Sequence, residues 1–115
     1  MWAGDRAPTN KQLLESYRQK FEVLSFGDKG AQMQLRENTL MAIRRAFGPD
    51  HEYRDSFRRI GIYPEYYPSS EHDNMAYWDS GKRRAVTLLN TMIHELELDE
   101  AESATREKGG VESQR

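Results

Sequence analysis

The chain has 115 residues, which is enough for one domain but too short for two independent hydrophobic cores. Hydrophobic residues make up 37% and charged residues 31%, so we expect a modest core under a well solvated surface. The formal net charge of −2 argues against a general nucleic-acid-binding protein, which is normally basic, and the absence of cysteine excludes disulfides, thiolate metal sites and cysteine nucleophiles.

Residues 1–8 are expected to form a flexible arm whose only large apolar group is Trp2. We expect no secretory signal, because this stretch lacks an apolar segment, and no membrane span, because no apolar run approaches the required length of about 20 residues. Together with the missing cysteines, this pattern favours a cytoplasmic protein.

The first helix is predicted over residues 9–26. Thr9 and Gln12 form a capping-box pattern, and Gly27 is a suitable residue to follow a helix. The apolar residues between them follow the helical period: Leu13, Leu14, Tyr17, Phe21 and Leu24. The short turn at residues 27–30 then predicts that the first two helices are antiparallel.

The second helix is predicted over residues 31–47, and Gly48 and Pro49 end it. Its apolar stripe and the small residues beside it share one side: Leu35, Thr39, Leu40, Ala42, Ile43, Ala46 and Phe47. We interpret it as the central helix on which the others pack. A third, short helix follows through Arg59, with Asp50 as its candidate N-cap and Tyr53, Phe57 and Ile60 as its apolar positions.

Residues 61–74 are predicted to form a Pro- and Tyr-rich loop, since Pro64 and Pro68 bar a helix. We expect this loop to pack on the helices or to line a site. The last helix is predicted over residues 74–98. Gly81 lies on its apolar side, where it allows close approach either of Ala42 and Ala46 or of a ligand.

The apolar side of this last helix consists of Trp78, Ala85, Leu89, Met92 and Leu96, flanked by Leu88 and Ile93. Residues 99–115 are almost free of large apolar groups, so we expect a frayed helical extension and then a disordered tail. The predicted fold is therefore all-α, with a helical domain at residues 9–98. It is a small bundle of three long helices and one short helix, with the Pro/Tyr-rich loop between the last two.

No catalytic motif stands out. His51, His72 and His94 are far apart and form no helical metal-binding pair, and the His72-Asp73 dipeptide lies in the predicted Pro-rich loop. Neither a nucleophile elbow nor a Gly-rich phosphate loop is present. We therefore predict a protein that is not an enzyme and that needs no metal or cofactor.

Basic residues next to aromatic residues form the more informative pattern. Arginine suits phosphate oxygens and aromatic faces stack on bases, so together they predict a site for a small phosphorylated nucleotide. The candidate ligand-binding residues are Arg44, Arg45, Arg58, Arg59, Tyr63, Tyr67, Tyr77, Trp78, Gly81, Lys82 and Arg84. The alternative is that the basic residues only solvate helix surfaces, where the helix dipole favours arginine near C-termini, and that the aromatic residues belong to the core.

Assembly is a second interpretation. The apolar faces of three helices exceed what a small monomer easily covers, and a homo-oligomer would create a ligand pocket between subunits. The interface candidates are Trp2, Met33, Met41 and Met92, although methionine also fills gaps in cores.

Two runs, LRENTLMAIRRAFGPDHEYRDSFRRIGIYP and YWDSGKRRAVTLLNTMIHELEL, resemble a helical domain found beside TIR-like effectors in bacterial antiviral defence proteins. The matching positions are Leu40, Ile43, Phe47, Gly48, Phe57, Ile60, Pro64, Gly81, Ala85, Leu89, Met92 and Glu95, within roughly half of the chain. This chain departs from the pattern because we expect no effector module after the helical unit.

The resemblance implies a part that senses or binds without acting. We therefore expect a non-enzymatic protein that binds or sequesters a (cyclic) nucleotide immune signal, such as a phage-encoded anti-defence sponge. The alternative is a helical oligomerisation or adaptor domain that only mediates protein association.

Overall fold

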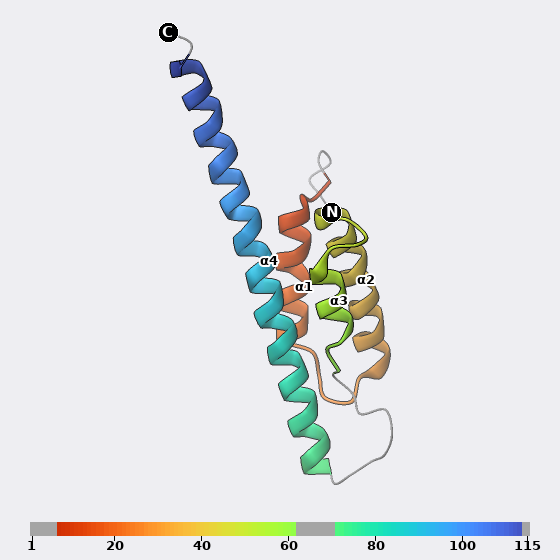
Figure 1. The fold of residues 1–115 in the computed structure, drawn as a ribbon. Coiled ribbons are helices and arrows are strands. Elements are labelled where there is room, and N and C mark those ends of the chain that lie inside the picture. Colours follow the sequence, from red (N-terminus) through yellow and green to blue (C-terminus); the bar gives the residue numbers. More distant parts are fainter. Residues whose placement is uncertain (1–6, 62–70, 114–115) are drawn as a thin grey trace.

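The computed structural model describes residues 7–61 and 71–113 of the chain, and in these ranges it contains four helices and no strand. The helices are α1 (Asn10–Glu22), α2 (Lys29–Phe47), α3 (Glu52–Arg58) and α4 (Glu71–Ser113). The predicted all-α class is confirmed, and three longer helices with one short helix agree with the predicted bundle (Figure 1). Most of the predicted Pro/Tyr-rich loop, including Tyr63 and Tyr67, lies outside the described residues.

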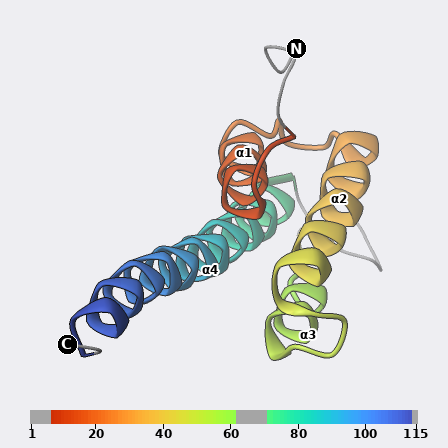
Figure 2. The same cartoon turned by 90° about the horizontal axis from the view of Figure 1, so that it is seen from above.

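The bundle is arranged so that α1 and α3 each contact both α2 and α4. Within the described residues α2 and α4 do not pack directly on each other, and the view along the bundle shows them on opposite sides (Figure 2). The prediction that α2 is the central helix is therefore wrong, because α1 has the most extensive packing and separates α2 from α4. For the same reason Ala42 and Ala46 do not provide the close helix surface that we expected opposite Gly81.

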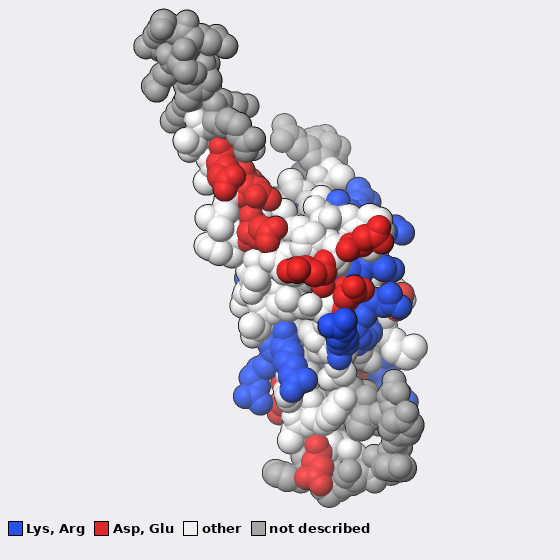
Figure 3. All heavy atoms as spheres, viewed as in Figure 1, with Lys and Arg blue, Asp and Glu red and all other residues white. Residues whose placement is uncertain are grey.

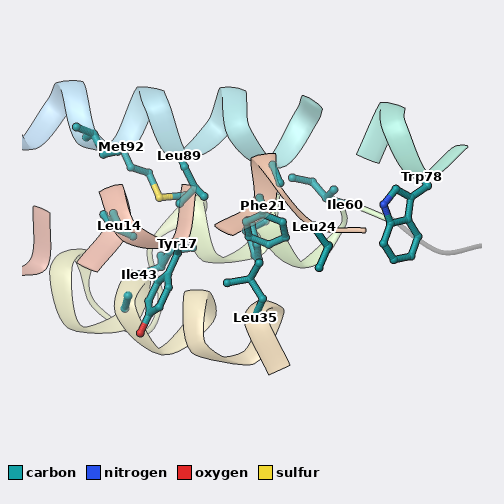
Figure 4. Packing of buried hydrophobic residues seen from close by; sticks show 14 residues of the cluster. Leu14, Tyr17, Phe21, Leu24, Leu35, Ile43, Ile60, Trp78, Leu89 and Met92 are labelled. Atoms are coloured by element: carbon teal, nitrogen blue, oxygen red, sulfur yellow. The ribbon is translucent and has the colours of Figure 1, made fainter. Parts of the chain in front are cut away.

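Side chains of all four helices meet in one core (Figure 4). Phe21 of α1 and Phe57 of α3 pack edge to face, with ring centroids 5.8 Å apart. The largest fully buried side chains are Trp78, Phe21, Phe57, Leu14, Ile43, Leu89, Met92 and Thr39. The Thr39 hydroxyl donates a 2.7 Å hydrogen bond to the Leu35 carbonyl within its own helix, so this buried polar group is satisfied.

The predicted capping box at the start of α1 is present. The Gln12 backbone N–H donates to the Thr9 hydroxyl at 3.1 Å, and the Thr9 N–H donates to the Gln12 side chain at 2.9 Å. The helix ends at Glu22 rather than at residue 26. Leu24 lies beyond this end but is still buried, so the apolar pattern that we read as helix continues into the following loop.

The next two helix starts are set by side-chain caps. Asp28 accepts from the Ala31 N–H at 3.1 Å, so α2 begins slightly earlier than expected. His51, and not Asp50, caps α3, because its Nδ1 accepts a 3.1 Å hydrogen bond from the Tyr53 N–H. Gly48, with φ of +101°, ends α2 in a conformation that glycine adopts without strain.

Helix α4 is longer than its predicted range of residues 74–98. It starts at Glu71 and continues to Ser113, well beyond the bundle (Figure 1). Residues 99–108 contain neither glycine nor proline and include several strong helix formers. The sequence therefore gives no stop signal where the apolar stripe ends, and the helix runs on without a core partner.

Candidate functional site

The two arginine pairs of α2 and α3 are exposed but lie apart. Arg44 and Arg45 occupy the last turn of α2, close to where α3 begins, whereas Arg58 and Arg59 lie where α3 ends. At 1.5 Å per residue, α3 separates the two pairs by about 10 Å along its axis. The fold therefore does not gather all the predicted arginines into one crevice.

Lys82 of α4 has a structural contact. Its ammonium donates a 2.9 Å hydrogen bond to the carbonyl of Leu24, in the loop that follows α1. This bond supplies a donor to a backbone carbonyl that lies beyond the last turn of α1. The Lys82 ammonium is thus used in holding the α1–α2 connection against α4.

The aromatic candidates are divided between core and surface. Trp78 is fully buried, and its ring packs edge to face on Phe26 at 5.6 Å, so its faces are not open to a base. Gly81 is also buried. Tyr77 is 46% exposed and is the one aromatic candidate within the described residues that is accessible for stacking.

A groove between α3 and α4, which we call the α3–α4 groove, brings together a different set of polar residues. It has a volume of about 510 Å³ and is lined by Ser56, Ile60, Ser80, Arg83, Arg84, Thr87, Leu88 and Thr91. Of the predicted site residues, Arg84 is in this set. Figure 3 shows basic side chains over the lower half of α4, separated by uncharged surface from those over α3 and α2.

Among the residues that the structure describes, the polar lining of the α3–α4 groove consists of arginine, serine and threonine side chains and contains no carboxylate. Arg83 and Arg84 are both exposed, and neither forms an ion pair with any residue that the structure describes. Two arginines in the same groove lining as serine and threonine hydroxyls suit the oxygens of a phosphate group. The size of the groove falls within the range of small-molecule sites.

The four hydroxyl-bearing residues of the groove were not among the predicted site residues. Ser80, Arg84, Thr87 and Thr91 are spaced four, three and four residues apart, which places them on one side of a helix. The sequence alone therefore indicates that these four polar residues share one side of the helix. Ser56, in contrast, joins them only through the packing of α3 on α4.

A second groove lies between α1 and α4, with a volume of about 580 Å³. Its lining consists of Glu22, Asp79, Lys82, Arg83, Val86 and Thr87. Because two carboxylates oppose its two basic groups and Lys82 is already bonded to a carbonyl, this groove suits an anion less well than the α3–α4 groove does.

Among the described residues, no group of three or more histidine, aspartate or glutamate side chains is placed to hold a metal ion. The same part of the chain contains no helix that is both long and apolar enough to cross a membrane. Comparison of the chain with protein-family models, with curated proteins and with solved structures gives no match. The geometry of the grooves is therefore the basis for the function considered next.

Proposed function

We propose that this protein is a non-enzymatic binding protein that holds a small phosphorylated ligand in the α3–α4 groove. The observation that carries the proposal is the pair Arg83 and Arg84, which are exposed and lie in a groove with four hydroxyls. Among the described residues, neither arginine has an ion-pair partner and the groove lining has no carboxylate. In this proposal the two guanidinium groups bind the phosphate oxygens, and the hydroxyls orient them.

The ligand class that we favour is a nucleotide signal, including the cyclic nucleotides of antiviral immunity. The resemblance to helical domains beside TIR-like effectors supports this choice, and Tyr77 offers a half-exposed ring on the same helix as both arginines. The lining residues that the structure describes offer donors but no histidine or carboxylate that would activate a hydroxyl as nucleophile. Retention of the ligand, rather than its conversion, is the activity that these residues suit, as in a sponge.

Calorimetric titration with a panel of cyclic dinucleotides, cyclic trinucleotides and ADP-ribose derivatives tests the proposal. We expect binding to at least one of them, and weaker binding as salt is raised, because exposed charges are screened. In the variant Arg83→Glu/Arg84→Glu we expect the affinity to fall by more than about tenfold.

The matched control is Arg44→Glu/Arg45→Glu, which reverses an equally exposed arginine pair outside the groove lining. This variant should bind as the wild type does. Absence of heat with every member of the panel, or equal losses in both double variants, would show that the α3–α4 groove is not a ligand site.

A second candidate function is helical oligomerisation, and one observation favours it. Near the point where helix α4 leaves the bundle, Leu98 is 50% exposed and lines a hollow with Ala101, Glu102 and Thr105. A helix that leaves its core partners with an apolar side chain still exposed is a common site of association between chains. Sedimentation at increasing protein concentration distinguishes this candidate from a monomeric ligand-binding protein.

A further inference from the structure

One side of α4 faces away from the bundle along most of the helix. Ser80, Arg84, Thr87 and Thr91 lie on this side where it borders the α3–α4 groove. Farther along α4, the hollow described above lies on the same side of the helix. Its lining consists of Leu98, Ala101, Glu102 and Thr105. The steps of three and four residues, and of seven between Thr91 and Leu98, keep these positions on one side, which we call the outer face of α4.

The outer face changes sign along its length. Its first part carries Arg84 and its later part carries Glu102, which belongs to a segment, residues 95–102, with five acidic residues and no basic one. The space-filling view shows basic groups over the lower half of α4, together with acidic groups there, and only acidic groups over the upper part of the helix that is coloured (Figure 3). A helix with this charge order attracts a second copy of itself in the antiparallel direction.

Most of the acidic residues in this segment already have contacts within the chain. Glu95 accepts a hydrogen bond from the Tyr53 hydroxyl, and Glu97 and Glu100 lie 3.7 and 3.5 Å from the Lys11 ammonium. Glu102 is exposed and forms no ion pair with the described residues. Glu102 and Arg84 are therefore opposite charges on the outer face of α4. Neither forms an ion pair with the residues that the structure describes.

We propose that the outer faces of two copies of α4 pack against each other as an antiparallel homodimer with Thr91 at the two-fold axis. Arg84 and Leu98 are each seven residues, about two turns, from Thr91. In this register Leu98 of the partner subunit lies opposite Arg84, and Glu102 of the partner subunit lies one turn farther along on the same side. The two-fold symmetry gives two Arg84–Glu102 ion pairs, one at each end of the interface.

The packing of this interface suits the small residues at its centre. Thr87 and Thr91 allow two helix backbones to approach closely, and Leu98 of the partner subunit enters the α3–α4 groove beside Ile60 and Leu88. The half-exposed Leu98 is thereby covered. This inference rests on the second candidate function, oligomerisation, and defines its interface. Because the dimer uses Arg84, it competes with a phosphorylated ligand for the same groove.

Sedimentation equilibrium of the full chain over a range of concentrations tests the interface by exchange of charges. We expect the wild type to dimerise and to dissociate as salt is raised. Arg84→Glu alone and Glu102→Arg alone should each weaken the dimer by about tenfold or more. An equimolar mixture of these two variants should associate again, because each chain then offers the charge that the other lacks, and the combined variant Arg84→Glu/Glu102→Arg should self-associate for the same reason.

Arg45→Glu, an exposed charge reversal on α2, is the matched control and should dimerise as the wild type does. Circular dichroism of each variant verifies that the helices are intact. A dimer that survives both single reversals, or that is not restored in the mixture, overturns this interface but leaves oligomerisation standing. A wild-type chain that stays monomeric at every concentration overturns both.

Discussion

The hydroxyl of Tyr53 donates a 2.6 Å hydrogen bond to the carboxylate of Glu95, and this bond joins the short helix α3 to α4. Tyr53 also packs edge to face on Phe47 at 4.9 Å, so its ring is fixed from the other side. The hydrogen bond to Glu95, followed by desolvation and the negative charge of that carboxylate, raises the pKa of Tyr53 to about 12. The α3–α4 groove depends on this attachment, because α3 provides Ser56 and Ile60 to its lining.

Tyr53→Phe should lower the free energy of unfolding by about 1 kcal/mol at neutral pH. The substitution keeps the ring and its contact with Phe47 but removes the donor to Glu95, and both partners are partly buried. Urea denaturation of both proteins measures the difference. Glu95→Gln is the companion variant, and an equal stability of wild type and Tyr53→Phe would show that the bond contributes nothing.

The same pair predicts a dependence on alkaline pH. The pKa of Tyr53 is about 12 in the folded chain and near 10 in the unfolded chain, so the folded state holds this proton more tightly. Its contribution to stability is therefore complete below pH 10 and is lost as pH rises from 10 to 12. The difference in stability between wild type and Tyr53→Phe should shrink over this interval. In a pH titration followed by tyrosinate absorbance, the variant should lack the tyrosine that the wild type ionises near pH 12.

Arg36 should contribute to stability although it lies outside every predicted site. Its guanidinium donates to the carbonyl oxygens of Arg58 and Ile60, so it supplies donors at the C-terminal end of α3. We expect Arg36→Met to cost about 1–2 kcal/mol in the free energy of unfolding, since the hydrogen bonds come from a charged group that is partly buried. Arg44→Met, on the same helix but exposed, should change stability by less than about 0.5 kcal/mol. Similar costs for both variants would rule out this role of Arg36.

The sequence was sufficient to predict that four helices form and which residues make most of the core, but not where every helix begins and ends. Phe21, Phe57 and Leu89 follow the helical period, and they are buried as that period predicts. Local capping chemistry was equally readable at Thr9 and Gly48. These features depend on neighbours within one or two turns, and such short-range information is present in a single sequence.

The arrangement of the site was not readable in the same way. Lys82 looked like part of a basic cluster, but its ammonium is bonded to Leu24, a residue far away in the chain. Trp78 looked like a stacking platform, but it is covered by Phe26. Whether a basic or aromatic residue is free to meet a ligand depends on which helices become neighbours, and neither the helical period nor the residue type determines that.

Met92 and Met33 give a matched test of the core. Met92 is fully buried, and Met33 is 60% exposed. Met92→Ala should therefore cost about 2–5 kcal/mol in the free energy of unfolding, because a cavity opens among Leu14, Leu89 and their neighbours. Met33→Ala should stay within about 0.5 kcal/mol. Chemical denaturation at low protein concentration measures both, and a large cost at Met33 would contradict its exposure in the folded chain.

Substitutions of Lys82 and Arg84 should distinguish a basic residue of α4 that stabilises the fold from one that binds the ligand. Lys82→Met keeps the aliphatic stem but removes the donor to the Leu24 carbonyl, so we expect a loss of about 1–2 kcal/mol in stability and unchanged ligand affinity. Arg84→Ala removes an exposed groove residue, so its stability should change little while the affinity for a phosphorylated ligand falls by about tenfold. Thermal denaturation and calorimetric titration of the two variants measure both quantities, and a loss of affinity in Lys82→Met at temperatures where it is folded would assign Lys82 to the binding site.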